Sequence, residues 1–308
     1  MKHRIILYGL LLLSISIDSI AQKCGIIVDD NNRVGIAYST ISVLKKPNGT
    51  ISDEQGRFCF ELPNKLNLSD SIFISALGYE NKTISVKQYA QFDTLFLKEK
   101  IIVLEEVIVK SKKRHQIRLG NFHKNWMMQQ TSFMPNSNAI LASRIENSKL
   151  LEGVITKLYY RLSPQKTDFI QKFRLRCRIY KNSEANIPTY DILNNNVIID
   201  VNPDDKFIEI DLSSKNITFK EQYIWVGIQT VGYIDNNNDF FSLSDFQYGK
   251  VKYRKKNPNK TAKIFNISPS FLMNDTGMGM ELISGMKYWN AISPNKNNVP
   301  MIGVTVEY

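Results

Sequence analysis

The chain has 308 residues and a formal net charge of +11. Its three cysteines are too few for a disulfide scaffold, and they include no CxxC pair that could bind zinc. After the N-terminal region, no segment is long and apolar enough to span a membrane as a helix, which needs about 20 residues. The basic charge favours acidic partners such as lipid head groups, anionic glycans, nucleic acid or an acidic protein face.

The first residues have the pattern of a secretory signal. A short positive region precedes a mostly apolar run over residues 5–17. Ser19 and Ala21 then place small residues at the −3 and −1 positions of a cleavage site. We therefore predict a signal peptide over residues 1–21 and an exported mature chain. An uncleaved anchor or a buried strand is the alternative. A lipid anchor at Cys24 is disfavoured because a lysine precedes it.

Residues 22–109 hold short β-runs separated by turn signals. In one of them Phe58 and Phe60 point to one side and Cys59 to the other, and the glycine two residues before Phe58 suits the positive φ of a hairpin turn. Strands this short and evenly spaced predict an antiparallel β-sandwich. Cys24 and Cys59 both lie opposite their strands' expected core faces. The sequence therefore allows a disulfide between them without requiring it.

Three motifs carry a resemblance: GIIVD at residues 25–29, GTISDEQGRF at 49–58 and SALGY at 75–79. They resemble the carboxypeptidase regulatory-like domain, a small prealbumin-like β-sandwich. LEEVIV at residues 104–109 resembles the strand that closes the same module in TonB-dependent outer-membrane receptors. The resemblance covers roughly the first third of the chain. It implies a module without peptidase residues, structural or interacting, in an exported protein of a Gram-negative bacterium.

Residues 110–120 form a basic run without apolar periodicity. We predict that this run is the linker between two domains, because such charged segments are usually solvated. A tail that binds polyanions is the alternative.

Residues 121–308 are predicted to form a second β domain. A short helix is expected within 121–130, followed by about eight strands, a number that suits a jelly-roll-like sandwich. Motifs at 173–179, 211–213 and 223–227 resemble, more loosely, an uncharacterised sandwich domain that often follows regulatory-like modules in exported bacterial proteins. The predicted fold class is therefore all-β, with a prealbumin-like first sandwich and a jelly-roll-like second one.

The strand expected over residues 173–180 shows the cleanest alternation, with apolar residues on one face. Arg174, Arg176 and Arg178 share the other face, about 7 Å apart along the strand. This spacing can bridge successive phosphates, sulfates or carboxylates, so we predict exposed ligand-binding arginines. A solvated face that pairs with acidic residues on neighbouring strands is the commoner origin of such a row. Cys177, on the apolar face, is predicted to be a buried free thiol.

No catalytic constellation is evident in the sequence. His115 and His123 lie in no nucleophile motif. Glu209 and Asp211 lie two residues apart on one expected strand, which is a candidate spacing for glycoside hydrolysis but also what any solvated strand face provides. We therefore predict no catalytic residue, no metal and no cofactor.

Two further features have ordinary structural interpretations. The acidic turn at residues 235–239 resembles the start of a calcium loop, but phenylalanines occupy the sixth and twelfth positions. An Asx-rich turn is the better prediction. Trp126, Trp225 and Trp289 are candidates for a sugar-stacking platform. Trp225, however, lies in a run that is apolar on both faces, which favours core packing.

These features together predict a non-catalytic exported protein of the bacterial envelope, in the periplasm or associated with the outer membrane. It would act as an interaction or structural module. A carbohydrate-binding module and a carbohydrate-active enzyme with an unrecognised carboxylate pair are the alternatives. The expected partners are an anionic glycan or an envelope protein, with peripheral membrane association. No nucleic acid is expected.

Overall fold

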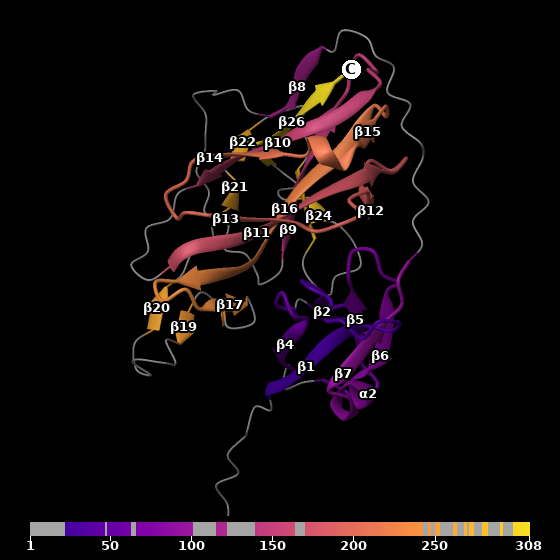
Figure 1. The fold of residues 1–308 in the computed structure, drawn as a ribbon, viewed down its shortest axis with the longest axis vertical. Helices are drawn as coiled ribbons and strands as arrows, with labels where there is room; N and C mark the ends of the chain where they lie inside the picture. Colours follow the sequence, from indigo (N-terminus) through magenta and orange to yellow (C-terminus); the bar gives the residue numbers. More distant parts are fainter. Residues whose placement is uncertain are drawn as a thin grey trace, which may run out of the picture.

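The computed structural model describes residues 22–46, 48–62, 66–100, 115–121, 139–163, 170–242 and 298–308, together with short strands between residues 246 and 291. These residues are mostly β-strand and form an N-terminal domain and a larger C-terminal β domain (Figure 1). The predicted all-β fold class is confirmed. No helix in the described ranges is long and apolar enough to cross a membrane. The predicted signal peptide and the run at 104–109 lie outside the described residues, as does the predicted helix within 121–130 apart from residue 121.

The first domain consists of two sheets. One is three-stranded, with β1 antiparallel to β4 and parallel to β7. Its strands are β4 (Arg57–Glu61), β1 (Gln22–Asp29) and β7 (Thr94–Leu97). The other is four-stranded and antiparallel, in the order β3 (Gly49–Ile51), β2 (Thr40–Val43), β5 (Ser71–Ser75) and β6 (Lys82–Ser85).

The core of this domain lies between its two sheets. Ile27 and Phe58 from the first sheet pack with Ile41 and Ile72 from the second, and helix α2 (Val86–Gln91) adds the buried ring of its tyrosine. Alternation along each strand places these apolar side chains on the inner faces. The predicted tight turn before β4 is confirmed, because the glycine at residue 56 has a φ of +77°.

The second domain also has two main sheets. The six-stranded sheet has the path β14 (Phe207–Asp211), β10 (Gly153–Ser163), β26 (Ile302–Glu307) and β8 (Gln116–Gly120), and β15 (Ile217–Phe219) and β21 (Ser268–Pro269) also pair with β10. The eight-stranded sheet has the path β12 (Pro188–Asp191), β11 (Ile170–Asn182), β16 (Tyr223–Asp235), β9 (Ile140–Glu146), β23 (Gly279–Leu282) and β24 (Asn290–Ala291), with β13 (Val197–Val201) on β11 and β17 (Phe240–Ser242) on β16.

Shorter elements complete the described part of this domain. They are the 3-10 helix η1 (Ser213–Lys215), the three strands β18 (Phe246–Gln247), β19 (Lys250–Lys252) and β20 (Thr261–Lys263), and the pair β22 (Phe271–Met273) and β25 (Asn298–Pro300).

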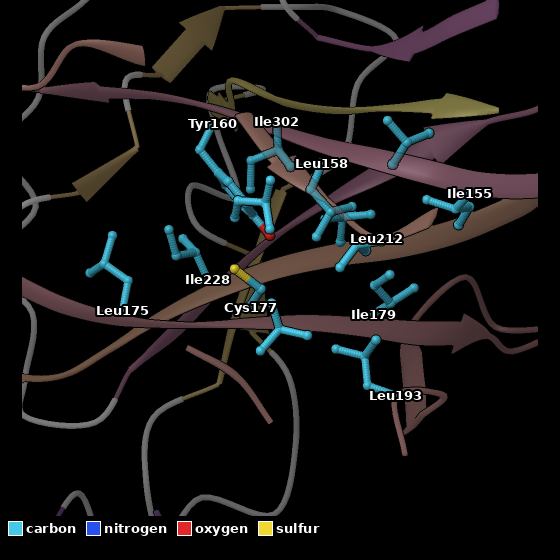
Figure 2. Packing of buried hydrophobic residues seen from close by; sticks show 14 of the residues in the cluster. Ile155, Leu158, Tyr160, Leu175, Cys177, Ile179, Leu193, Leu212, Ile228 and Ile302 are labelled. Atoms are coloured by element: carbon cyan, nitrogen blue, oxygen red, sulfur yellow. The ribbon is translucent and has the colours of Figure 1, made fainter. Parts of the chain in front are cut away.

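The two large sheets enclose the main core. Figure 2 shows Leu158 and Ile302 from the six-stranded sheet pointing toward Cys177 and Ile179 from the eight-stranded sheet. Cys177 is buried and free, as predicted. The opposite face of β16 is buried as well, with Trp225 fully covered. Core packing of this tryptophan is therefore confirmed.

The domain boundary differs from the predicted one. Gln116–Gly120 forms β8 and pairs with β26, so five residues of the predicted 110–120 linker belong to the second domain's sheet. Ile117 and Leu119 pack against the main core. Two apolar residues at alternate positions are enough for a short edge strand, and the surrounding basic residues obscured this pattern.

Candidate functional site

The first domain contacts Arg174 and Arg176 on the arginine face of β11, whereas Arg178 is engaged within the second domain. Arg176 is 1% exposed, and the side chains of Arg174 and Arg178 are 15% and 12% exposed. The prediction that these arginines lie exposed is therefore wrong. The spacing along the strand was correct, but a sequence pattern does not show that another domain packs on the polar face.

Arg176 has its guanidinium buried among neutral acceptors. Nε donates to Oε1 of Gln229 at 3.0 Å, and Nη2 donates to the same oxygen and to the hydroxyl of Thr40. Nη1 donates to the main-chain carbonyl of Tyr38. Burial lowers the pKa of Arg176 well below its ordinary value, and the neighbouring charge of Arg178 acts in the same direction. Hydrogen bonds from both domains therefore stabilise this buried charge.

Arg174 joins three acceptors, two of them from the first domain. Its Nε and Nη2 bind the two carboxylate oxygens of Asp200 at 2.7 and 2.8 Å, a bidentate pair between neighbouring strands. Its Nη1 donates to Glu54 Oε1 and, at 3.2 Å, to the hydroxyl of Tyr38. Hydrogen bonds to Asp200, together with the charges around it, raise the pKa of Arg174.

Arg178 is engaged within the second domain. Its Nη1 donates to Oδ2 of Asp191 at 2.9 Å, and both side chains are largely buried. The other carboxylate oxygen of Asp191 accepts the main-chain N–H of Leu193 at 2.9 Å. Burial alone would lower the pKa of Arg178, but Tyr180 and Asp191 raise it above its ordinary value. This pair ties β12 to β11.

Tyr38 is the first-domain residue on which these contacts converge. Its φ is +55°, in the left-handed region that non-glycine residues rarely adopt. Its hydroxyl donates to Glu54 Oε1 at 2.9 Å, and its ring packs with Ile51 and with Val231 of β16. Burial, followed by the hydrogen bond to Glu54, raises its pKa to about 12. Such a backbone conformation persists where the surrounding contacts enforce it.

These contacts define an interdomain seam. It consists of Tyr38, Thr40, Glu54 and Ile51 from the first domain and Arg174, Arg176, Gln229 and Val231 from the second. Sequence reasoning identified the arginines but missed every first-domain partner. The arginines and their first-domain partners lie 120 to 138 residues apart in the chain, and no local pattern links them.

The candidate carboxylates are engaged in local contacts. The Lys157 ammonium binds Glu209 across neighbouring strands. Asp211 accepts the main-chain N–H of Ser213 at 2.8 Å, and its hydrogen bonds with Ser213 lower its pKa. Both acids lie exposed on one strand face rather than on opposite sides of a site. This arrangement does not supply the facing pair that glycoside hydrolysis needs.

The acidic turn is an Asx turn, as predicted. Oδ1 of Asp235 accepts the main-chain N–H groups of Asn237 and Asp239 at 2.8 and 3.0 Å. Within the described ranges, no three His, Cys, Asp or Glu side chains are grouped so that they could hold a metal ion. His115 is exposed beside the ring of Tyr308. The other histidine candidate, His123, and the tryptophans at 126 and 289 lie outside the described residues.

Comparison with known proteins identifies the first domain. Residues 24–109 match the family of CarboxypepD_reg-like domains, in agreement with the resemblance of the three motifs. No curated protein matches the chain. The matched segment ends before β8, and the second resemblance stays a prediction. The chain therefore consists of a CarboxypepD_reg-like domain followed by further β structure whose family this match does not reach.

Proposed function

We propose that this protein is a non-catalytic, exported envelope protein that works as one rigid interaction or structural unit. The observation that carries the proposal is the interdomain seam. Two of the three arginines in the row on β11, Arg174 and Arg176, bind residues of the first domain.

If a flexible linker were the only connection between the two domains, the polar face of β11 would lie in water, where arginine side chains are well solvated. Arg176 is instead buried, and two of its acceptors come from the first domain. A buried cation without those acceptors would be costly, so the docked arrangement is favoured. Two β domains in fixed orientation can present surfaces to an envelope partner at a constant separation.

The rigid unit can be tested by cutting between the domains. Trypsin should be used briefly on the mature protein to cleave after the basic residues at 110–114, which mass spectrometry would verify. We expect the two fragments to elute together in size-exclusion chromatography under native conditions. Fragments that separate without denaturant would contradict a rigid unit.

Export and the lack of catalysis need separate measurements. Cell fractionation should place the mature protein, starting at Gln22, in the envelope, and a protein that remains with the cytoplasmic fraction would refute export.

The lack of catalysis is tested on candidate substrates. Mass spectrometry of peptidoglycan fragments and envelope oligosaccharides incubated with the protein should show no conversion. Conversion that disappears in Glu209→Gln would instead support the enzyme alternative.

A further inference from the structure

Cys24 and Cys59 form a disulfide across two neighbouring strands. They are direct partners in the β1–β4 ladder, and their Cα atoms lie 3.9 Å apart. Both side chains lie on the outer face of the three-stranded sheet, because the inner face of β4 is formed by Phe58 and Phe60. Cys24 is exposed and Cys59 is half-buried. The bond is therefore open to solvent in the folded domain.

The disulfide also lies where the sheet is narrowest. β4 pairs with residues 22–26 of β1, whereas β7 begins to pair only at Ile26. The segment before Ile26 is therefore held on one side by β4. Gly25, which lies on the same face of β1 as the core residue Ile27, pairs with Phe58 of the core. An external thiolate therefore has to reach the sulfur atoms from the outer face of the sheet, with the β1–β4 ladder closed.

Two polar contacts of the Lys23 side chain restrain the same segment. The Lys23 ammonium lies 2.9 Å from the carboxylate of Asp93, whose side chain is 84% exposed, and 2.9 Å from the main-chain carbonyl of Ala90. Exposed ion pairs contribute only about 0–1 kcal/mol. The β1–β4 ladder and the contacts of Lys23 do not depend on the S–S bond, so we expect the first domain to stay folded when the disulfide is reduced.

We propose that Cys24–Cys59 is a thiol–disulfide exchange site that accepts the thiolate of an external dithiol while the protein stays folded. The thiolate attacks Sγ of Cys24, the S–S bond breaks, and Cys59 leaves as a thiolate that takes a proton from water. The second thiol of the dithiol then displaces Cys24 from the mixed disulfide. The dithiol is oxidised by two electrons, and the cysteine pair is reduced.

The remaining cysteine cannot take part. Cys177 is fully buried in the main core, and burial raises the pKa of its thiol to about 12. It can be alkylated only when the second domain opens, since the thiolate is the reactive species. Cys177 therefore reports global unfolding in the same molecule in which the exchange is measured.

The experiment treats the mature protein with dithiothreitol under native conditions, alkylates at intervals and maps the labels by peptide mass. We expect labels on Cys24 and Cys59, none on Cys177, and an unchanged near-UV circular dichroism spectrum. The reduction rate should be within about tenfold of that in denaturant, because attack does not wait for unfolding. Labels that appear on all three cysteines together would overturn the proposal.

Two further arms sharpen the test. A thioredoxin-type protein whose resolving cysteine is replaced should be trapped on Cys24 or Cys59 if the physiological thiol is carried by a protein. If reduced glutathione reduces the disulfide and the thioredoxin-type protein is not trapped, the site reacts with small thiols. The Cys24→Ser, Cys59→Ser variant is the control, in which Cys177 should remain unlabelled. If that variant does not fold, the kinetics of the unchanged protein still decide the question.

Discussion

The guanidinium of Arg176 donates to the main-chain carbonyl of Tyr38, a residue 138 positions earlier in the chain. Tyr38 presents this carbonyl from a left-handed backbone conformation. The buried charge of one domain and the unusual backbone of the other therefore stabilise each other. Each would lose a partner if the domains separated.

Replacing Arg176 with methionine should destabilise the whole protein. The variant keeps much of the side-chain volume but leaves the carbonyl of Tyr38 buried without this donor and takes two hydrogen bonds from Gln229. We expect the free energy of unfolding to fall by about 2–4 kcal/mol, because unsatisfied buried acceptors cost roughly 1–3 kcal/mol each. Urea denaturation followed by circular dichroism measures this change.

Arg57→Gln is the matched control for that substitution. Arg57 lies on β4 with an exposed side chain, so its replacement should change stability by less than about 0.5 kcal/mol. Equal losses in the two variants would show that the effect of Arg176→Met does not come from the seam.

The two carboxylate partners of Arg174 should differ in strength. Asp200 is 27% exposed and binds through two oxygens, whereas Glu54 is 53% exposed. Double-mutant cycles with Arg174→Met, Asp200→Asn and Glu54→Gln measure the two coupling energies. We expect about 1–2 kcal/mol for Asp200 and about 0–1 kcal/mol for Glu54, since exposure weakens ion pairs. The reverse order would contradict the geometry of the seam.

The sequence predicted the inner face of β11 correctly but not its outer face. Alternation alone places Cys177 in the core, because a strand has only two faces and the apolar one is buried. Whether Arg176 meets water or protein depends on residues such as Tyr38 and Thr40, far away in the chain. Periodicity contains no information on such long-range contacts. Local turn signals, by contrast, predicted the Asx turn at Asp235.

Gly56 and Gly78 separate two effects of adding a methyl group. Both have positive φ, +77° and +84°. A Cβ on Gly56 would lie 2.4 Å from the carbonyl oxygen of Ile27, whereas at Gly78 the nearest heavy atom is 3.7 Å away. Gly78→Ala should cost about 1–2 kcal/mol through backbone strain alone.

Gly56→Ala should be more destabilising by at least about 1 kcal/mol, because the β1 backbone must shift to relieve the contact. Thermal unfolding of the two variants, compared in one buffer, gives the difference. Equal melting temperatures would mean that the turn before β4 adapts without strain.

Asp29 makes stability depend on pH in the acid range. Its carboxylate accepts the main-chain N–H groups of Asn31 and Asn32 at 2.7 and 3.2 Å and the hydroxyl of Tyr79 at 3.1 Å. The hydrogen bond from Asn31 is the largest cause that lowers its pKa. The folded state thus binds the proton less tightly than the unfolded chain does.

The stabilisation from Asp29 is therefore complete above its unfolded pKa of about 3.9, and it is lost as the pH falls through the lower folded value. As the pH is lowered from 5, the free energy of unfolding of the Asp29→Asn variant should fall less steeply than that of the unchanged protein. Parallel declines in urea titrations at several pH values would show that other groups control acid sensitivity.

The position of β26 has a consequence for the order of synthesis. Ile302–Glu307 lies between β10 and β8 in the middle of its sheet, although it is the last strand in the sequence. Among the described strands, β8 pairs only with β26. Residues 116–120 therefore have no strand to pair with until a segment almost 190 residues later has been synthesised. A chain that emerges from a ribosome or a translocation channel can complete its first domain early. The second domain cannot complete its six-stranded sheet until residues 302–307 have been made. During that interval its unpaired strands are exposed and could be bound by a chaperone.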